Sequence, residues 1–445
     1  MEKDMTVGNP GRTLFFFAVP MVLGNLFQQL YNIIDSIIVG NYVGADALAA
    51  VGASASITFL FVAIATGLSI GSSVIISQYF GAKRFAEMKT AVQTVMTASA
   101  VIALALTMAG IFITDTILRF MQTPESIFQD ASLYLKIYLG GLIFLFLYNM
   151  LTASFNAIGD SKSPLVFLAF SSVCNIVLDI HFVANLKMGV AGAALATDIS
   201  QAVSVAISFL WLRIRLGKMK IEGKSRIFDW GILAVICEVA VPSVLQQSMV
   251  SIGVFLVQRL VNGYGESVMA GFAAATKIDS IAILPMVNVG NAVSTFTAQN
   301  IGGDKPRRVR QGFRAGLLMS AVIGAAVTAV LLLYSEVFVG LFMDTESNRA
   351  AIQAGVEYLH VVGLFYALMG LMNTCTGILR GAGDILWFLM VTMINLTARV
   401  ILAYSMSGFM GAKAIWWSIP IGWGIGFCIG VLRYRSGKWQ RAKLI

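Results

Sequence analysis

The strongest constraint on this chain is a series of twelve long apolar runs separated by short polar loops. A helix needs about 20 apolar residues to cross the hydrocarbon layer of a membrane, and a helix satisfies all of its own backbone groups there. Only 12% of the residues are charged, against about 25% in a typical soluble domain. The sequence therefore predicts an all-α polytopic membrane protein with twelve transmembrane helices. The runs cover about 13–39, 47–80, 91–114, 131–157, 164–184, 190–212, 231–260, 267–300, 312–335, 351–379, 387–406 and 413–432.

The two halves of the chain are similar to each other in sequence. An offset of 221 residues, held across positions 41–84, gives eight identities in 44 positions. Pro20 and Pro242 lie just upstream in the two copies. Duplicated helix bundles are the usual architecture of secondary transporters. The identical pairs are Asn41/Asn262, Gly44/Gly265, Ala49/Ala270, Ala53/Ala274, Ile57/Ile278, Ser73/Ser294, Gln78/Gln299 and Gly81/Gly302.

Six predicted helices precede the basic linker 213–230 and six follow it. Because six is even, both halves enter the membrane in the same direction. We therefore expect two lobes, 1–218 and 219–445, related by a pseudo-two-fold axis along the membrane normal. One set of loops and termini holds 23 of the 31 Lys and Arg residues, which predicts a plasma (inner) membrane protein with both termini in the cytoplasm.

Composition and motifs exclude several classes of protein. The net charge of +9 follows from the loop bias, and no basic patch alternates with exposed aromatics, so we expect no nucleic-acid partner. The four cysteines lack paired spacing and fall inside predicted helices, and two distant histidines are too few for a metal site. Enzyme motifs of the His-Glu-x-x-His or Gly-x-Ser-x-Gly type are not found in or beside the apolar runs, so no enzyme activity or cofactor is expected.

Acids inside the first six predicted helices are the best candidates for function. Asp35 lies late in the first helix, and Asp179 in the fifth follows Asn175 by one turn. A carboxylate at the bilayer centre costs about 2.5–3.5 kcal/mol, so each needs a partner or a role. With Thr197, these oxygens suit H⁺ or a hard cation such as Na⁺. Asp198 either joins this site or solvates a helix end.

Other polar residues in the predicted helices have less specific roles. Lys277, Asp279 and Arg399 are best interpreted as members of structural ion pairs, with a substrate or gating role as the alternative. Arg399 occupies the repeat position of Asp179, and Asn395 that of Asn175. Four glutamines follow the repeated prolines and either face a cavity or pack between helices. They are Gln28, Gln29, Gln246 and Gln247.

These residues resemble those of the multidrug and toxic compound extrusion (MATE) transporters, of the bacterial or archaeal type with an acidic cation site in the N-lobe. The resemblance covers the whole chain and rests on Pro20 with Asp35, on Gln78-x-x-Gly81, on Asn175–Asp179 and on Gly189–Thr197. It implies two lobes arranged as a V, with alternating access and antiport of organic cations against H⁺ or Na⁺. It also implies a cation site at Asp35, Asn175, Asp179 and Thr197, and a bend of the first helix near Pro20.

One departure from the family limits this transfer. Another branch carries a Glu eight residues after the proline of the seventh helix and an Asp in the tenth helix, but this chain has Val250 and no acid in 360–378. A C-lobe cation site is therefore not expected. The predicted substrates are bulky organic cations, carried by a monomer in the lipid bilayer. The alternatives are a lipid-linked precursor flippase, with few basic residues here to bind pyrophosphate, and a channel.

Overall fold

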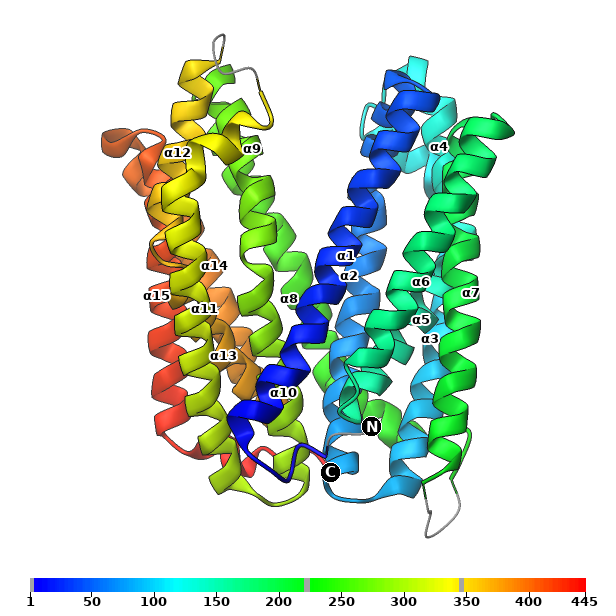
Figure 1. The fold of residues 1–445 in the computed structure, drawn as a ribbon, viewed down its shortest axis with the longest axis vertical. Helices are drawn as coiled ribbons and strands as arrows, with labels where there is room; N and C mark the ends of the chain where they lie inside the picture. Colours follow the sequence, from blue (N-terminus) through cyan, green and yellow to red (C-terminus); the bar gives the residue numbers. More distant parts are fainter. Residues whose placement is uncertain (1–3, 220–224, 344–347) are drawn as a thin grey trace. The chain divides into compact units, whose positions relative to one another are not determined.

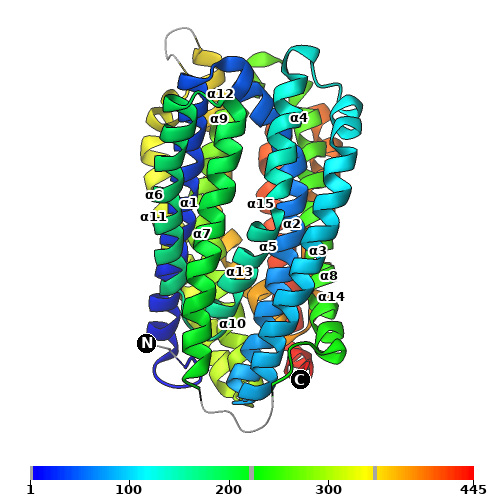
Figure 2. The same ribbon diagram turned by 90° about the vertical axis from the view of Figure 1, so that its right-hand side faces the viewer.

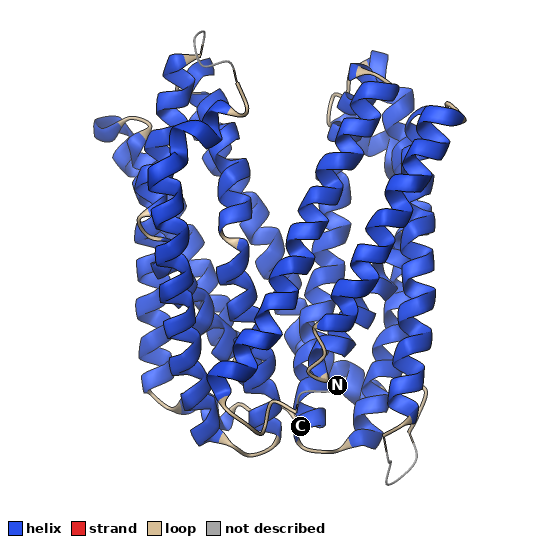
Figure 3. Cartoon of the chain, viewed as in Figure 1, coloured by secondary structure: helices blue, strands red, loops and turns tan. Residues whose placement is uncertain are grey.

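The computed structural model describes residues 4–219, 225–343 and 348–445, so part of the linker 213–230 lies outside the described residues. The described chain contains helices and loops and no strand (Figure 3). The helices are labelled in Figure 1 and run in chain order as α1 (Pro10–Tyr42), α2 (Ala45–Gly81), α3 (Phe85–Phe120), α4 (Glu125–Gly140), α5 (Leu142–Ala157), α6 (Lys162–Asp179), α7 (Gly189–Gly217), α8 (Trp230–Asn262), α9 (Glu266–Ala282), α10 (Leu284–Gly302), α11 (Pro306–Gly340), α12 (Arg349–Gly363), α13 (Tyr366–Ala382), α14 (Ile385–Met410) and α15 (Lys413–Arg435).

The number of spans agrees with the prediction of twelve. Ten helical segments of the described chain are each long and apolar enough to cross a membrane, with α9 and α10 forming one of them. Two bent pairs complete the set: α4 with α5, bent by 48°, and α12 with α13, bent by 51°. The two breaks fall in the fourth and the tenth span, which are the same place in each half of the chain.

The helices form two compact units, and the first helix of each half belongs to both. Unit 1 contains 23–244 and unit 2 contains 4–22 and 245–445, with the undescribed first residues left aside. Relative to the predicted ranges 1–218 and 219–445, the first part of α1 is grouped with the second half of the chain, and the first part of α8 with the first half. In both helices the change of unit comes three residues after the internal proline, Pro20 or Pro242.

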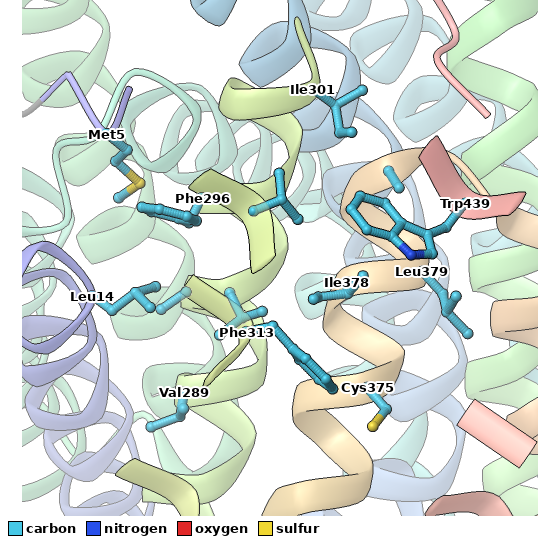
Figure 4. Packing of buried hydrophobic residues seen from close by; sticks show 14 of the residues in the cluster. Met5, Leu14, Val289, Phe296, Ile301, Phe313, Cys375, Ile378, Leu379 and Trp439 are labelled. Atoms are coloured by element: carbon cyan, nitrogen blue, oxygen red, sulfur yellow. The ribbon is translucent and has the colours of Figure 1, made fainter. Parts of the chain in front are cut away.

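The start of the chain is anchored within unit 2. Leu14 and Phe17 are buried in one apolar cluster with Phe296, and Figure 4 shows Leu14 and Phe296 in it. The Met5 N–H donates to Oε1 of Gln299 at 3.0 Å. Gln299 is the repeated glutamine of the second half of the chain, so one of its roles is to bind the segment that precedes α1.

The segment before α8 is anchored in the corresponding way within unit 1. The backbone N–H groups of Arg226 and Asp229 donate to Oγ1 of Thr90 and Thr94 on α3, both at 3.0 Å. The first part of α8 then crosses α2 closely at Gly67, where a Cβ atom would lie 2.3 Å from Val244 Cγ2. Small residues are needed where two helix backbones approach in this way.

Each unit also contains one buried ion pair at an equivalent place. Asp160, between α5 and α6, pairs with Arg215 of α7. Asp384, between α13 and α14, accepts from Arg433 Nε at 2.6 Å and from Nη2 at 3.1 Å. The Asp side chains are 5% and 7% exposed, so both pairs are well shielded from water. The two halves therefore share an ion pair that joins the end of the fourth span to the end of the sixth.

Candidate cation-coupling site

The centre of the candidate site is a break in regular helix geometry in unit 1. Helix α6 ends at Asp179, and a π-helical segment, Ile180–Asn185, follows directly. Asn175 lies one turn before Asp179, and both side chains are almost completely buried, at 1% and 0% exposure. Wider π-helical turns are frequent at functional sites because they change the direction of the side chains around them.

The Asn175 amide connects α6 to α7. Its orientation follows from its neighbours, since only one choice satisfies both ends. In that choice its nitrogen donates to Asp179 Oδ2 at 2.7 Å and its oxygen accepts from the Thr197 N–H at 3.2 Å. The sequence expectation that Asn175, Asp179 and Thr197 lie together is met by this geometry.

Helix α1 brings Asp35 to the same place. The carboxyl groups of Asp35 and Asp179 lie within hydrogen-bonding reach of each other. Oδ1 of each is buried and has no hydrogen-bond partner within the described chain. Two carboxylates at this distance repel each other unless a proton or a cation lies between them. The pair can therefore hold a proton, or a cation for which the two free oxygens and the Thr197 hydroxyl are suitable ligands.

Three tyrosines complete the surroundings of this pair, and the sequence analysis did not select them. Tyr31, one turn before Asp35 on α1, has its hydroxyl group within hydrogen-bonding reach of the Thr197 side chain. Tyr134 and Tyr138 of α4 stack on each other, with ring centroids 6.3 Å apart and planes at 17°. The signal that was available for Tyr31 is its spacing of four residues from Asp35, which places both on one helix face.

The remaining candidate site residues of α1 and α7 lie in different surroundings. Asp198 is half-buried, and it follows Thr197 on α7 but packs against Gly141 at the break between α4 and α5. Gln28 is exposed and Gln29 half-buried. Pro20 is buried inside α1, in the part that belongs to unit 2.

In unit 2 the predicted polar residues form a different kind of cluster. Asp279 of α9 accepts a hydrogen bond from the Tyr366 hydroxyl at 2.6 Å and is also bonded by Tyr358. Arg399 of α14 is close enough for its charge to act on Asp279, and its Nε is buried with no partner among the described residues. Lys277 lies over the Phe342 ring, 5.7 Å from its centroid.

The expected ion pairs of Lys277, Asp279 and Arg399 are thus replaced by other contacts. None of the three is in an ion pair within 4.0 Å in the part of the chain that the structure describes. Asp279 is bonded instead by the hydroxyl groups of Tyr358 in α12 and Tyr366 in α13, which lie on either side of the break between these helices. Of the remaining glutamines, Gln246 donates to Thr392 Oγ1 at 3.3 Å, which is packing between helices, and Gln247 is half-buried.

A duplicated set of spanning helices with ionisable groups inside it is typical of a membrane transporter. The family model MatE matches this chain twice, at residues 20–181 and 242–405. The chain belongs to this family, the MATE transporters, and the two matches fall on the two copies of the repeat. Members of the family are transporters and not enzymes.

Similar proteins carry names that agree with this class. The chain is 32% identical to the probable multidrug resistance protein YpnP of Bacillus subtilis, over 99% of this chain and 98% of that protein. It is 24% identical to the probable multidrug resistance protein NorM of Thermotoga maritima, over 98% and 94% of the two chains. These relatives favour multidrug transport over the flippase alternative.

Solved structures of the family have the same fold. One describes the outward-facing conformation of a multidrug resistance MATE family transporter of the MOP superfamily; it has a TM-score of 0.90 and 25% identity, and the similarity covers 98% of both chains. Another shows a MATE protein in the straight conformation, with a TM-score of 0.89, 25% identity and the same coverage. The protein is a multi-pass membrane protein of the MATE multidrug efflux family.

Proposed function

We propose that this protein is a secondary antiporter of the plasma (inner) membrane that exports bulky organic cations in exchange for H⁺ or Na⁺, by alternating access. The observation that carries the proposal is the carboxyl pair Asp35–Asp179, which lies in spanning helices and retains two buried oxygens without a partner. Two adjacent carboxyl groups are more stable when they share one proton or cation than when both are ionised and no positive charge is bound. The names of the relatives, multidrug resistance proteins, support the choice of substrate class.

The expected cycle follows from where these residues lie. Asp35 and Tyr31 belong to α1, whereas Asn175, Asp179 and Thr197 belong to α6 and α7. Loss of the shared cation would make the two carboxylates repel, and this favours movement of α1 away from α6. Pro20 removes one backbone hydrogen bond of α1 and makes a bent form of that helix easier to reach. Ion release and a change in α1 would then be linked, as coupling requires.

The test is efflux of a fluorescent cation from vesicles, with H⁺ and Na⁺ gradients imposed separately. We expect one of the two gradients to drive efflux, and that result also identifies the coupling ion. Asp35→Asn and Asp179→Asn should each abolish gradient-driven efflux while the protein remains in the membrane. Near-normal transport by both variants would contradict the proposal.

The matched control is Asp115→Asn, which changes an acid of a spanning helix outside the pair. Asp115 already binds Lys136 at 2.9 Å and the Ser132 hydroxyl at 2.5 Å, and it lies half exposed. Because Asp115 has its own cation and is half exposed, loss of its charge should leave the ion dependence of transport unchanged.

A further inference from the structure

An acid of α7, Asp198, packs against the break in the fourth span at a position where only glycine leaves room for it. Helices α4 and α5 meet at Gly140 and Gly141 and both pack against α7, and Figure 2 shows these helices from the side of unit 1. A Cβ atom on Gly141 would lie 2.0 Å from Oδ1 of Asp198 and 2.2 Å from its Cγ. The Asp198 carboxyl group therefore rests directly on the backbone of the break, and any side chain at position 141 would displace it.

Neighbouring Gly140 has different surroundings. A Cβ atom there would meet no atom within 4 Å, so the space beside it is open. The two glycines thus share a break but differ in function: position 141 makes room for a carboxyl group, whereas position 140 could carry a methyl group. This difference supplies a matched control for the experiment below.

The Asp198 carboxylate has no positive partner in this environment. The described residues give it no hydrogen bond and no ion pair, although it lies half-buried in a spanning helix. By contrast, Asp115 binds Lys136, Asp160 binds Arg215, and Asp35 and Asp179 lie against each other. An acid inside the membrane is costly unless a proton or a cation neutralises it, and no cation among the described residues does so here, which leaves this carboxyl group available to a cation from outside the protein.

Two tyrosines of α4 lie near enough to this acid to be affected by its charge. Its charge acts on the hydroxyl groups of Tyr138 and Tyr134, which belong to the last turns of α4 before the break. Tyr138 is half-buried and stacks on Tyr134. A carboxylate and nearby tyrosines are groups that recognise ammonium-type cations, because aromatic rings and carboxylates both attract positive charge.

We propose that Asp198, with Tyr138 and the Gly141 break, is the subsite that receives the positively charged group of the transported compound. The ligand class is a bulky lipophilic cation, such as a quaternary ammonium, phosphonium or protonated aryl amine. The subsite rests on the proposed antiport function but is separate from the coupling pair. Thr197 and Asp198 are neighbours on α7, with Thr197 facing Asn175 and Tyr31 and Asp198 facing the break. One helix therefore contacts both sites, and a shift of α7 changes both at once.

The test is equilibrium binding of tetraphenylphosphonium to the purified full-length protein in detergent. Asp198→Asn keeps the size of the side chain and removes its charge, and we expect the Kd to rise at least about tenfold, which corresponds to ~1.4 kcal/mol. Gly141→Ala should raise the Kd similarly, because the new methyl group displaces the carboxyl group. The double variant should bind no worse than either single variant, since both remove the same contact.

Gly140→Ala is the control and should bind like the wild type. Wild-type affinity in both Asp198→Asn and Gly141→Ala, or no binding by the wild type, would overturn the subsite. Failure of the antiport proposal would look different: tetraphenylphosphonium would bind in an Asp198-dependent way, but neither an H⁺ nor a Na⁺ gradient would drive its efflux.

Discussion

The fifth spans of the two halves contain the same asparagine, but the residue one turn later has opposite charge in the two. In α6 of unit 1, Asn175 is followed one turn later by Asp179, and in α14 of unit 2, Asn395 is followed one turn later by Arg399. Asp179 lies against a second acid and keeps a free oxygen, whereas Arg399 is itself a cation close to Asp279. Under the proposed antiport, one copy of the repeat takes up an external cation, whereas the other contains a cationic side chain, Arg399, at the corresponding position. The comparison teaches that ion coupling is expected in one unit only.

The largest effect should come from removing the cationic side chain of Arg399. Arg399→Met removes the positive charge that acts on Asp279 and leaves tyrosines as the partners of this buried acid. An uncompensated buried charge costs on the order of 3–5 kcal/mol. We expect a large fall in the melting temperature of the purified protein. The double variant with Asp279→Asn should recover most of that loss, because no uncompensated charge remains. Equal destabilisation by the single and the double variant would show that Arg399 contributes through packing and not through its charge.

The ion pairs shared by the two units should have a similar effect in both. Asp384→Asn removes the charge that Arg433 binds through two hydrogen bonds, and Asp160→Asn does the same to Arg215. Because the Arg side chains are 15% and 17% exposed, we expect a cost of about 2–3 kcal/mol for each, below that of a fully buried pair. Thermal melting of the two variants measures this. A large loss in one unit and none in the other would show that only one pair stabilises the fold.

Replacement of the internal proline should affect transport more in α1, which contains Pro20, than in α8, which contains Pro242. Pro20 lies in the helix that carries Asp35, whereas the part of α8 that follows Pro242 contains no acid. We expect Pro20→Ala to slow transport several-fold while binding of the cation changes little, since a straight α1 is favoured when its missing hydrogen bond is restored. Pro242→Ala should slow it less. Transport rates in vesicles and tetraphenylphosphonium binding make the distinction, and equal losses of rate and affinity in Pro20→Ala would indicate a folding defect.

The smallest effect concerns the caps of the same two helices. Asn9 accepts from the Arg12 N–H before α1, and Asp229 accepts from the Gly231 and Ile232 N–H groups before α8. The backbone N–H of Ile232, followed by Gly231 and Arg226, holds the pKa of Asp229 below its ordinary value. A lowered folded-state pKa gives stability that is present above the ordinary value and is lost as the pH falls through the folded value. Asp229→Asn should therefore flatten a slight loss of stability in acid, whereas Asn9→Ser should not change the pH dependence of melting.

Much of this architecture follows from the sequence. The run lengths give twelve spans, and the spacing of Asn175 and Asp179 places both on one face of α6, since residues four apart are neighbours on a helix. Asp35 and Thr197 reach the same place through packing between helices far apart in the sequence, and the family resemblance supplied that information. The shared asparagine of the fifth spans, Asn175 and Asn395, was enough to equate Asp179 with Arg399, but the partners of these two residues had to come from the structure.

Other features had no local signal. The division of α1 and α8 over the two units has no periodic signal in the sequence, and neither do the hydrogen bonds that hold the segments before these helices to α10 and α3. The partner of Asp384 is 49 residues away in the sequence, and Tyr366 reaches Asp279 across 87 residues. The Gly140–Gly141 pair is a visible breaker in the fourth apolar run, yet its relation to Asp198 depends on the direction in which α7 presents that side chain.

The central claim is that the coupling ion binds in unit 1 and not in unit 2. The most direct measurement is the number of protons, or of Na⁺ ions, released by purified protein in weakly buffered solution when tetraphenylphosphonium is added. We expect the wild type and Asp279→Asn to release the same number, and Asp35→Asn with Asp179→Asn to release none. Unchanged release by that double variant, or loss of release in Asp279→Asn alone, would contradict the account.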